Sequence, residues 1–141
     1  MSRFKSLTLA FSMATILVGS QSFAEEMKFK ADLKGSSEVP PTDSAGTGSA
    51  DVTVDTASKK LSWTVTSSGL SGDATAAHFH GPAAVGENAA PVVDISASVA
   101  SGSADITDQQ LADLQTGKLY LNIHTQKFPD GEIRGQVEKV Q

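Results

Sequence analysis

All three histidines of this 141-residue chain fall in two short segments. His78 and His80 stand in Ala-Ala-His-Phe-His-Gly-Pro, and His124 stands in Tyr-Leu-Asn-Ile-His-Thr. Because alternate side chains of a strand point to one face, an extended His-x-His pair places its imidazoles about 6 to 7 Å apart on the same side. A single metal ion can be held at that spacing. A third imidazole from a neighbouring strand would complete a site with an open coordination position.

The same histidines also have a purely structural interpretation. A strand histidine is more often a surface or hydrogen-bonded residue than a ligand, and His-x-His alone is a weak motif. Two features favour the metal: the chain has no other histidine, and Gly81-Pro82 ends the strand at the pair. The chain also has no cysteine, so imidazole and carboxylate are the ligands available, and imidazole suits copper, zinc, iron or nickel.

The elements that must carry these residues are predicted to be strands. Apolar and polar residues alternate with a period of two in the early part of the chain and in several later stretches. The expected strands are 27–34, 50–55, 61–66, 76–80, 92–97, 119–125 and 132–138. The segment 107–117 differs, because it begins with a capping box and ends at a glycine, which predicts one short helix. The predicted fold is an all-β antiparallel sandwich with that single helix.

Alternation also predicts which side chains surround the histidines. In 119–125 the apolar residues share one face, and Tyr120, Asn122 and His124 share the other. His124 therefore projects from the less buried side, where a ligand or solvent can reach it. Phe79 points away from the two histidines beside it and is expected in the core, where it would fix the direction of the imidazoles.

Residues 1–24 are predicted to be an export signal. Arg3 and Lys5 precede an apolar run, and Ser22-Phe23-Ala24 supplies the small residues that a signal peptidase requires. Cleavage would leave 117 of the 141 residues, enough for one domain, 25–141, in the periplasm or outside the cell. No cysteine follows the run to accept a lipid, so no membrane anchor is expected.

The charge of the mature chain narrows the range of partners. Two basic side chains leave with the signal, so nine of the eleven remain against 16 acidic ones, a net charge of about −7. Such a surface argues against nucleic acid and anionic lipid as partners. The sequence leaves open whether the chain forms a homodimer.

Longer motifs around the histidines resemble a known family. Glu38-Val-Pro-Pro near the start, Gly69-Leu70 before the first histidine block, and Gly-Glu-Ile-Arg134-Gly-Gln after His124 are typical of a chordin-type (CHRD) domain. The resemblance covers nearly the whole of 25–141. The order of these residues is also similar, more distantly, to copper/zinc superoxide dismutase. That similarity implies a Greek-key sandwich, superoxide-dismutase-like or immunoglobulin-like.

The dismutase resemblance further implies roles for individual residues. His78, His80 and His124 would be copper ligands, and Arg134 would attract the superoxide anion. The chain lacks the bridging histidine, the further zinc ligands and the disulfide of that family. One copper ion per chain is therefore expected, zinc is less expected, and the implied activity is that of a copper-only superoxide dismutase. The alternatives are a copper-buffering protein without turnover and an extracellular interaction module whose histidines are structural.

Two charged residues near the histidine blocks, Arg134 and Glu38, have more than one interpretation. Arg134 either faces the metal or forms a surface ion pair with Glu132 or Asp130. Glu38 is expected to be a solvent-exposed turn residue, and its alternative is an acidic partner for Arg134 or for a ligand histidine. Tyr120 is a further group expected close to the metal.

Overall fold

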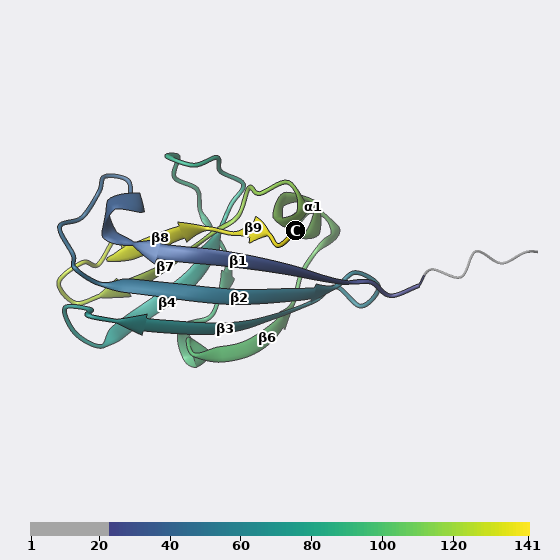
Figure 1. The fold of residues 1–141 in the computed structure, drawn as a ribbon, viewed down its shortest axis with the longest axis horizontal. Helices are drawn as coiled ribbons and strands as arrows, with labels where there is room; N and C mark the ends of the chain where they lie inside the picture. The colour runs from purple at the N-terminus through teal and green to yellow at the C-terminus, as the bar shows by residue number, and fades with distance from the viewer. Residues whose placement is uncertain (1–22) are drawn as a thin grey trace, which may run out of the picture.

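The computed structural model describes residues 23–141, which form nine strands, two short 3₁₀ turns and one α-helix (Figure 1). The helix is α1 (Asp108–Gln115), and the turns are η1 (Gly35–Ser37) and η2 (Ser96–Ser98). The strands are β1 (Glu26–Lys34), β2 (Thr47–Asp55), β3 (Lys60–Ser68), β4 (Ala74–His80), β5 (Pro91–Asp94), β6 (Ser101–Asp105), β7 (Tyr120–Thr125), β8 (Ile133–Gln136) and β9 (Glu138–Lys139). The predicted all-β class is confirmed.

The strands form one antiparallel sheet that folds over on itself. Their hydrogen-bonding order is β5-β4-β7-β8-β1-β2-β3-β6, and β9 also pairs with β1. The first three strands form a meander, and β8 returns beside β1, as in a Greek key. Trp63 of β3 meets Phe79 of β4 edge-on, with 6.2 Å between ring centroids, although four strands separate β3 from β4 in that order. The two halves of the sheet therefore face each other across one core.

The core follows from the alternation seen in the sequence. Along β1, buried and exposed residues alternate without a break, and Phe29 and Leu33 are almost fully buried. Phe79 is 0 % exposed, so its predicted core position is confirmed. Burying a large apolar side chain of this kind contributes about 2 kcal/mol to folding, so the ligand strand β4 is firmly anchored through its inward face.

The helix prediction is also confirmed. Thr107 Oγ1 accepts a hydrogen bond from the backbone N–H of Gln110, and the Gln110 side chain accepts one from the N–H of Thr107. This reciprocal pair is the predicted capping box. At the other end Gly117 has a φ of 69°, a left-handed conformation that glycine adopts at little cost.

Two predicted strands are shorter than their patterns suggested. The strand predicted at 92–97 ends at Asp94, because Asp94 Oδ1 accepts a hydrogen bond from the Ser96 backbone N–H at 2.8 Å and starts a turn there. The strand predicted at 132–138 divides into β8 and β9 at the buried Val137. The first strand is therefore ended by a local hydrogen bond. The second is interrupted where the side chain of Val137 packs into the core.

No strand pattern in the sequence marks β6. Its residues, Ser-Gly-Ser-Ala-Asp, include no large apolar side chain, yet they pair with β3 at the edge of the sheet. A Cβ atom on Gly102 would lie 2.5 Å from the Trp63 ring. The backbone of β6 is therefore positioned by its close approach to the Trp63 indole at Gly102. A pattern of alternating apolar residues does not reveal such a contact.

The predicted export signal lies almost entirely outside the described residues. Within 23–141, no helix is long and apolar enough to cross a membrane. The fold positions the histidines by placing β4 and β7 side by side. In their antiparallel register His78 lies opposite Asn122, and His80 lies opposite Tyr120.

Candidate metal centre

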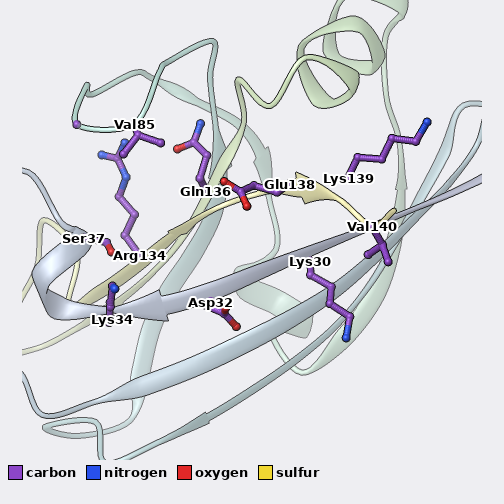
Figure 2. Close-up of a pocket in the computed structure, with 11 residues that line it drawn as sticks. Lys30, Asp32, Lys34, Ser37, Val85, Arg134, Gln136, Glu138, Lys139 and Val140 are labelled. Atoms are coloured by element: carbon purple, nitrogen blue, oxygen red, sulfur yellow. The ribbon is translucent and has the colours of Figure 1, made fainter.

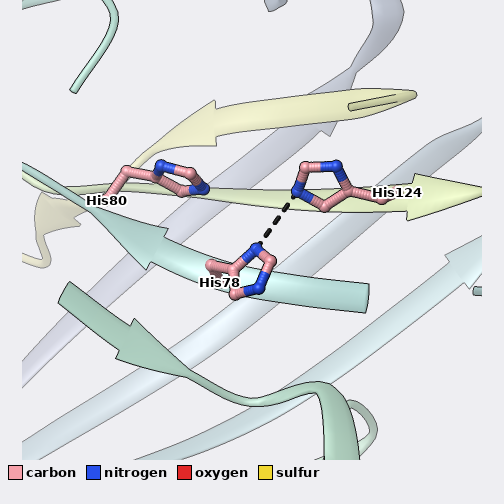
Figure 3. A group of neighbouring side chains, drawn as sticks. All are labelled: His78, His80 and His124. Atoms are coloured by element: carbon pink, nitrogen blue, oxygen red, sulfur yellow. Dashed lines mark hydrogen bonds between the residues drawn. The ribbon is translucent and has the colours of Figure 1, made fainter. Parts of the chain in front are cut away.

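The three histidines meet on one face of the β4–β7 pair (Figure 3). Each ring offers one nitrogen to the group, and these nitrogens all lie within 4.8 Å of one another. The closest pair is His78 Nδ1 and His124 Nε2, 3.2 Å apart. Two ligand nitrogens about 2.0 Å from one tetrahedral ion lie about 3.3 Å apart, so this pair already has the separation of metal ligands. The structure thus brings together all three residues that the sequence singled out.

Backbone carbonyls set the tautomers of two of these rings. His80 Nδ1 lies 2.9 Å from the carbonyl oxygen of Ala89, and His124 Nδ1 lies 2.8 Å from that of Pro129. A carbonyl oxygen only accepts hydrogen bonds, so we assign the ring proton to Nδ1 in both histidines. Each neutral ring then presents a lone pair at Nε2. Metal-binding histidines are commonly oriented in this way by a hydrogen bond from the other nitrogen.

His78 is oriented from the other side of its ring. Its Nε2 lies 3.8 Å from the Asp94 carboxylate, which favours a proton on Nε2 and leaves Nδ1 as the lone pair facing His124. Burial lowers the pKa of His78, and the nearby His124 acts in the same direction. Burial also lowers the pKa of His80. Both rings are therefore biased toward the neutral form, which is the form that binds metals.

A stack of planar groups restrains His80. Its ring lies parallel to Tyr120, with 4.7 Å between centroids and an angle of 5° between the planes. The Tyr120 hydroxyl donates to the Ala89 carbonyl and accepts from the Ala89 N–H, both at 3.2 Å. The Arg134 guanidinium lies 3.4 Å from the centroid of Tyr120. Tyr120 thus lies between the ring of His80 and the guanidinium of Arg134.

Arg134 is buried and bonded to the 81–90 loop. Only 2 % of it is exposed, and its guanidinium donates to the carbonyl of Glu87 and, at 3.0 Å, to Asn88 Oδ1. Figure 2 shows its side chain reaching toward the segment that carries Val85, at one side of a surface groove of about 420 Å³. The alternative of a surface ion pair with Glu132 or Asp130 is wrong, since Arg134 is buried and no described carboxylate lies within ion-pair distance of its guanidinium. Its attraction of an anion stays a prediction.

Glu38 is not the solvent-exposed turn residue that the sequence favoured. It is 6 % exposed, and its Oε1 atom is buried with no hydrogen-bond partner among the described residues. Burial raises the pKa of Glu38 to about 7, although the charge of Arg134 and the amide of Asn122 both act to lower it. A Cβ atom on Gly131 would lie 2.5 Å from Glu38 Oε1 and 2.8 Å from Asn122 Nδ2, so only glycine leaves room here. Glu38 therefore lies next to Asn122, beneath the loops.

Glu132 has a different environment from the one expected. Its carboxylate is 0 % exposed and accepts hydrogen bonds from Ser44 Oγ, from the Ser71 N–H and Oγ, and from Thr125 Oγ1. Burial by itself would raise the pKa of Glu132, but these hydrogen bonds outweigh it and lower the pKa to about 2. Glu132 thus ties two loops to the end of β7, one residue beyond His124.

Several groups at this centre left no signal in the sequence. Ala89 and Pro129 act through backbone carbonyls, which every residue possesses, and their roles follow only from where the loops lie. Asp94 is one of 16 acidic residues, and nothing in its sequence position connects it with His78. The sequence does contain turn-forming residues beside the ligands, Gly81-Pro82 and Pro129-Asp-Gly131. They indicate that loops begin there, next to the histidines.

Comparison with known proteins supports the resemblance to the CHRD domain family. No curated protein and no solved structure is significantly similar to this chain. The model of the CHRD domain family matches residues 29–137, which is most of the described chain and includes the three histidines. The chain therefore belongs to the CHRD domain family.

Proposed function

We propose that this CHRD domain binds one copper ion through His78 Nδ1, His80 Nε2 and His124 Nε2. The observation that carries the proposal is that three imidazole lone pairs converge, two of them with tautomers set by backbone carbonyls. Imidazole is a good ligand for copper. A site of three imidazoles with an open position can hold both Cu(I) and Cu(II), because it imposes the preferred geometry of neither ion. By the dismutase resemblance zinc is less expected, because the chain has neither the bridging histidine nor the further zinc ligands of that family.

Copper binding is tested directly by metal analysis of the protein isolated from its native compartment, followed by EPR of the Cu(II) form. We expect one copper ion per chain and a spectrum with hyperfine coupling from three nitrogens. Isothermal titration that detects neither copper nor zinc binding near neutral pH would overturn the proposal. That result would favour the interaction module with structural histidines.

A second proposal concerns what the site does with the ion. His78 and His124 are partly exposed whereas His80 is buried, so the centre opens toward solvent on one side. Bound copper would supply one-electron exchange with superoxide, so that two superoxide anions and two protons give oxygen and hydrogen peroxide. The protein's own part is to hold the ligands and leave that side accessible. This supports a copper-only superoxide dismutase acting in the periplasm or outside the cell.

The dismutase proposal needs a comparison with free copper. Copper-loaded protein is expected to consume superoxide faster than the same concentration of free copper under the same chelating conditions. His124→Ala is expected to remove that advantage. Tight binding by all three histidines without turnover would instead identify a copper-buffering protein.

Arg134→Ala is expected to weaken copper binding by about 10- to 100-fold, the usual cost of losing a group that orients a ligand. The reason is that Arg134 holds the loop at Glu87 and Asn88, and the next residue, Ala89, provides the carbonyl that orients His80. The measurement is copper affinity by competition with a chelator.

The matched control is Lys30→Ala, which removes a positive charge from the same groove but from an exposed side chain with no hydrogen bond to the loop. Lys30→Ala is expected to leave copper affinity unchanged. If Arg134→Ala also leaves the affinity unchanged, but slows superoxide consumption and weakens its dependence on ionic strength, then Arg134 attracts the anion and does not position the loop.

A further inference from the structure

We propose that Asn122 Oδ1 is the fourth protein donor to the copper ion, an inference that rests on the proposed copper site. Asn122 lies on β7 between Tyr120 and His124, on the face that carries the histidines, and directly opposite His78 on β4. Its side chain is 97 % buried, since only 3 % is exposed. The Asn122 amide therefore lies among the three histidine rings and is not at the protein surface.

The amide oxygen lies as close to two ligand nitrogens as neighbouring metal ligands lie to each other. Asn122 Oδ1 is 2.9 Å from His80 Nε2 and 3.0 Å from His124 Nε2. Donor atoms about 2.0 to 2.2 Å from one ion are separated by roughly 2.8 to 3.6 Å for angles between 90° and 110°. The oxygen and the two nitrogens are thus spaced as three donors to one bound ion would be.

Neither of these two short N···O contacts has a proton that one atom could donate to the other. The carbonyls of Ala89 and Pro129 require the ring protons on Nδ1 of His80 and His124, so both Nε2 atoms are lone pairs in the neutral rings. An amide oxygen also has no proton. Both N···O contacts therefore join an acceptor to an acceptor, which is unfavourable in a buried site unless a cation lies between them.

Turning the Asn122 amide around does not remove the conflict. With the amide reversed, Nδ2 would donate to the two histidines, but Oδ1 would be moved to the side where Glu38 Oε1 is buried without a partner. An ionised Glu38 carboxylate only accepts hydrogen bonds, so in that form it favours Nδ2 on its own side and leaves Oδ1 on the histidine side. Glu38 in this way selects the amide orientation that presents an oxygen to the metal.

An amide oxygen would change the chemistry of a three-imidazole site in a predictable direction. Oxygen is a harder donor than imidazole nitrogen and stabilises Cu(II) more than Cu(I). Asn122 is therefore expected to lower the copper reduction potential and to exclude water from the inner side of the ion. The solvent-facing side, next to His78 and His124, is left as the open position.

The test compares copper binding in both oxidation states for wild type, Asn122→Leu and Asn122→Asp. Leucine has a similar size and no donor, so Cu(II) affinity is expected to fall about tenfold or more while Cu(I) affinity changes less than about threefold. Aspartate keeps an oxygen donor and is expected to restore Cu(II) binding. A fall of equal size in both oxidation states would show that Asn122 only orients the imidazoles, and would overturn the proposal.

A spectroscopic signature separates donation from positioning even if the leucine variant folds poorly. The chain has only two asparagines, Asn88 and Asn122, so ¹³C-asparagine labels few positions. ENDOR of the wild-type Cu(II) protein is expected to show a ¹³C coupling that persists in Asn88→Asp, which removes the second asparagine but keeps the oxygen that accepts from Arg134. Loss of the coupling in Asn88→Asp that still binds one copper ion, or no coupling in wild type that binds one copper ion, would overturn the inference and leave the copper site standing. Wild type that binds no copper would instead overturn the proposed function.

Discussion

A chain in which His80 is replaced by alanine is expected to bind copper more than about 100-fold more weakly than wild type. Loss of a group that merely orients a ligand costs 10- to 100-fold, so loss of the ligand itself exceeds that range. His80 is the most restrained of the three, because its ring is stacked on Tyr120 and hydrogen-bonded to Ala89. The variant would retain only two of the three imidazole donors, those of His78 and His124. Chelator competition measures the difference.

The matched control for this variant is the neighbouring residue on the opposite face. Phe79→Leu removes packing in the core and is expected to lower the free energy of unfolding by about 1 to 2 kcal/mol, with all ligands still present. Its copper affinity should stay within about threefold of the wild-type value. If Phe79→Leu weakens copper binding as much as His80→Ala does, the effect comes from lost stability, and His80 is not shown to be a ligand.

The strands and the three imidazoles were predictable because both depend on periodicity. The His-x-His pair lies in an alternating strand, and the apolar face of 119–125 fixes the direction of His124. Burial of the inward faces then specifies the register, since a shift of one residue would turn every side chain to the other side. β6 was not predictable, because its fit depends on Gly102 approaching the Trp63 ring.

The surroundings of the histidines were less predictable because loops provide them. The orientation of His80 depends on a carbonyl of the 81–90 loop, and that loop is held by Arg134 from β8. Glu38 appeared to be a turn residue by composition, but the space left by Gly131 lets it lie buried beside Asn122. Such relations join segments far apart in the sequence, and no local pattern encodes them.

Replacing Glu132 by glutamine is expected to lower the free energy of unfolding at pH 7 by about 2 kcal/mol. The buried carboxylate accepts four hydrogen bonds from Ser44, Ser71 and Thr125, and no cationic side chain within 23–141 forms an ion pair with it. Glutamine keeps the shape but removes the charge that strengthens these bonds. Because these contacts hold two loops to β7 beside His124, the same variant should also loosen the copper site. Urea unfolding at several pH values gives the measurement.

The pH dependence of this difference follows from the lowered pKa. The folded-state pKa of Glu132 is about 2, below the ordinary 4.5, so the stability it contributes is complete above about pH 4.5 and is lost as the pH falls toward 2. Wild type and Glu132→Gln should therefore differ most near neutral pH and converge in acid. The exposed Glu138, changed to glutamine, is the control and should alter stability by less than about 0.5 kcal/mol. A Glu132→Gln difference that stays constant from pH 7 to pH 2 would mean that the carboxylate's charge contributes nothing, and that shape alone holds the loops to the end of β7.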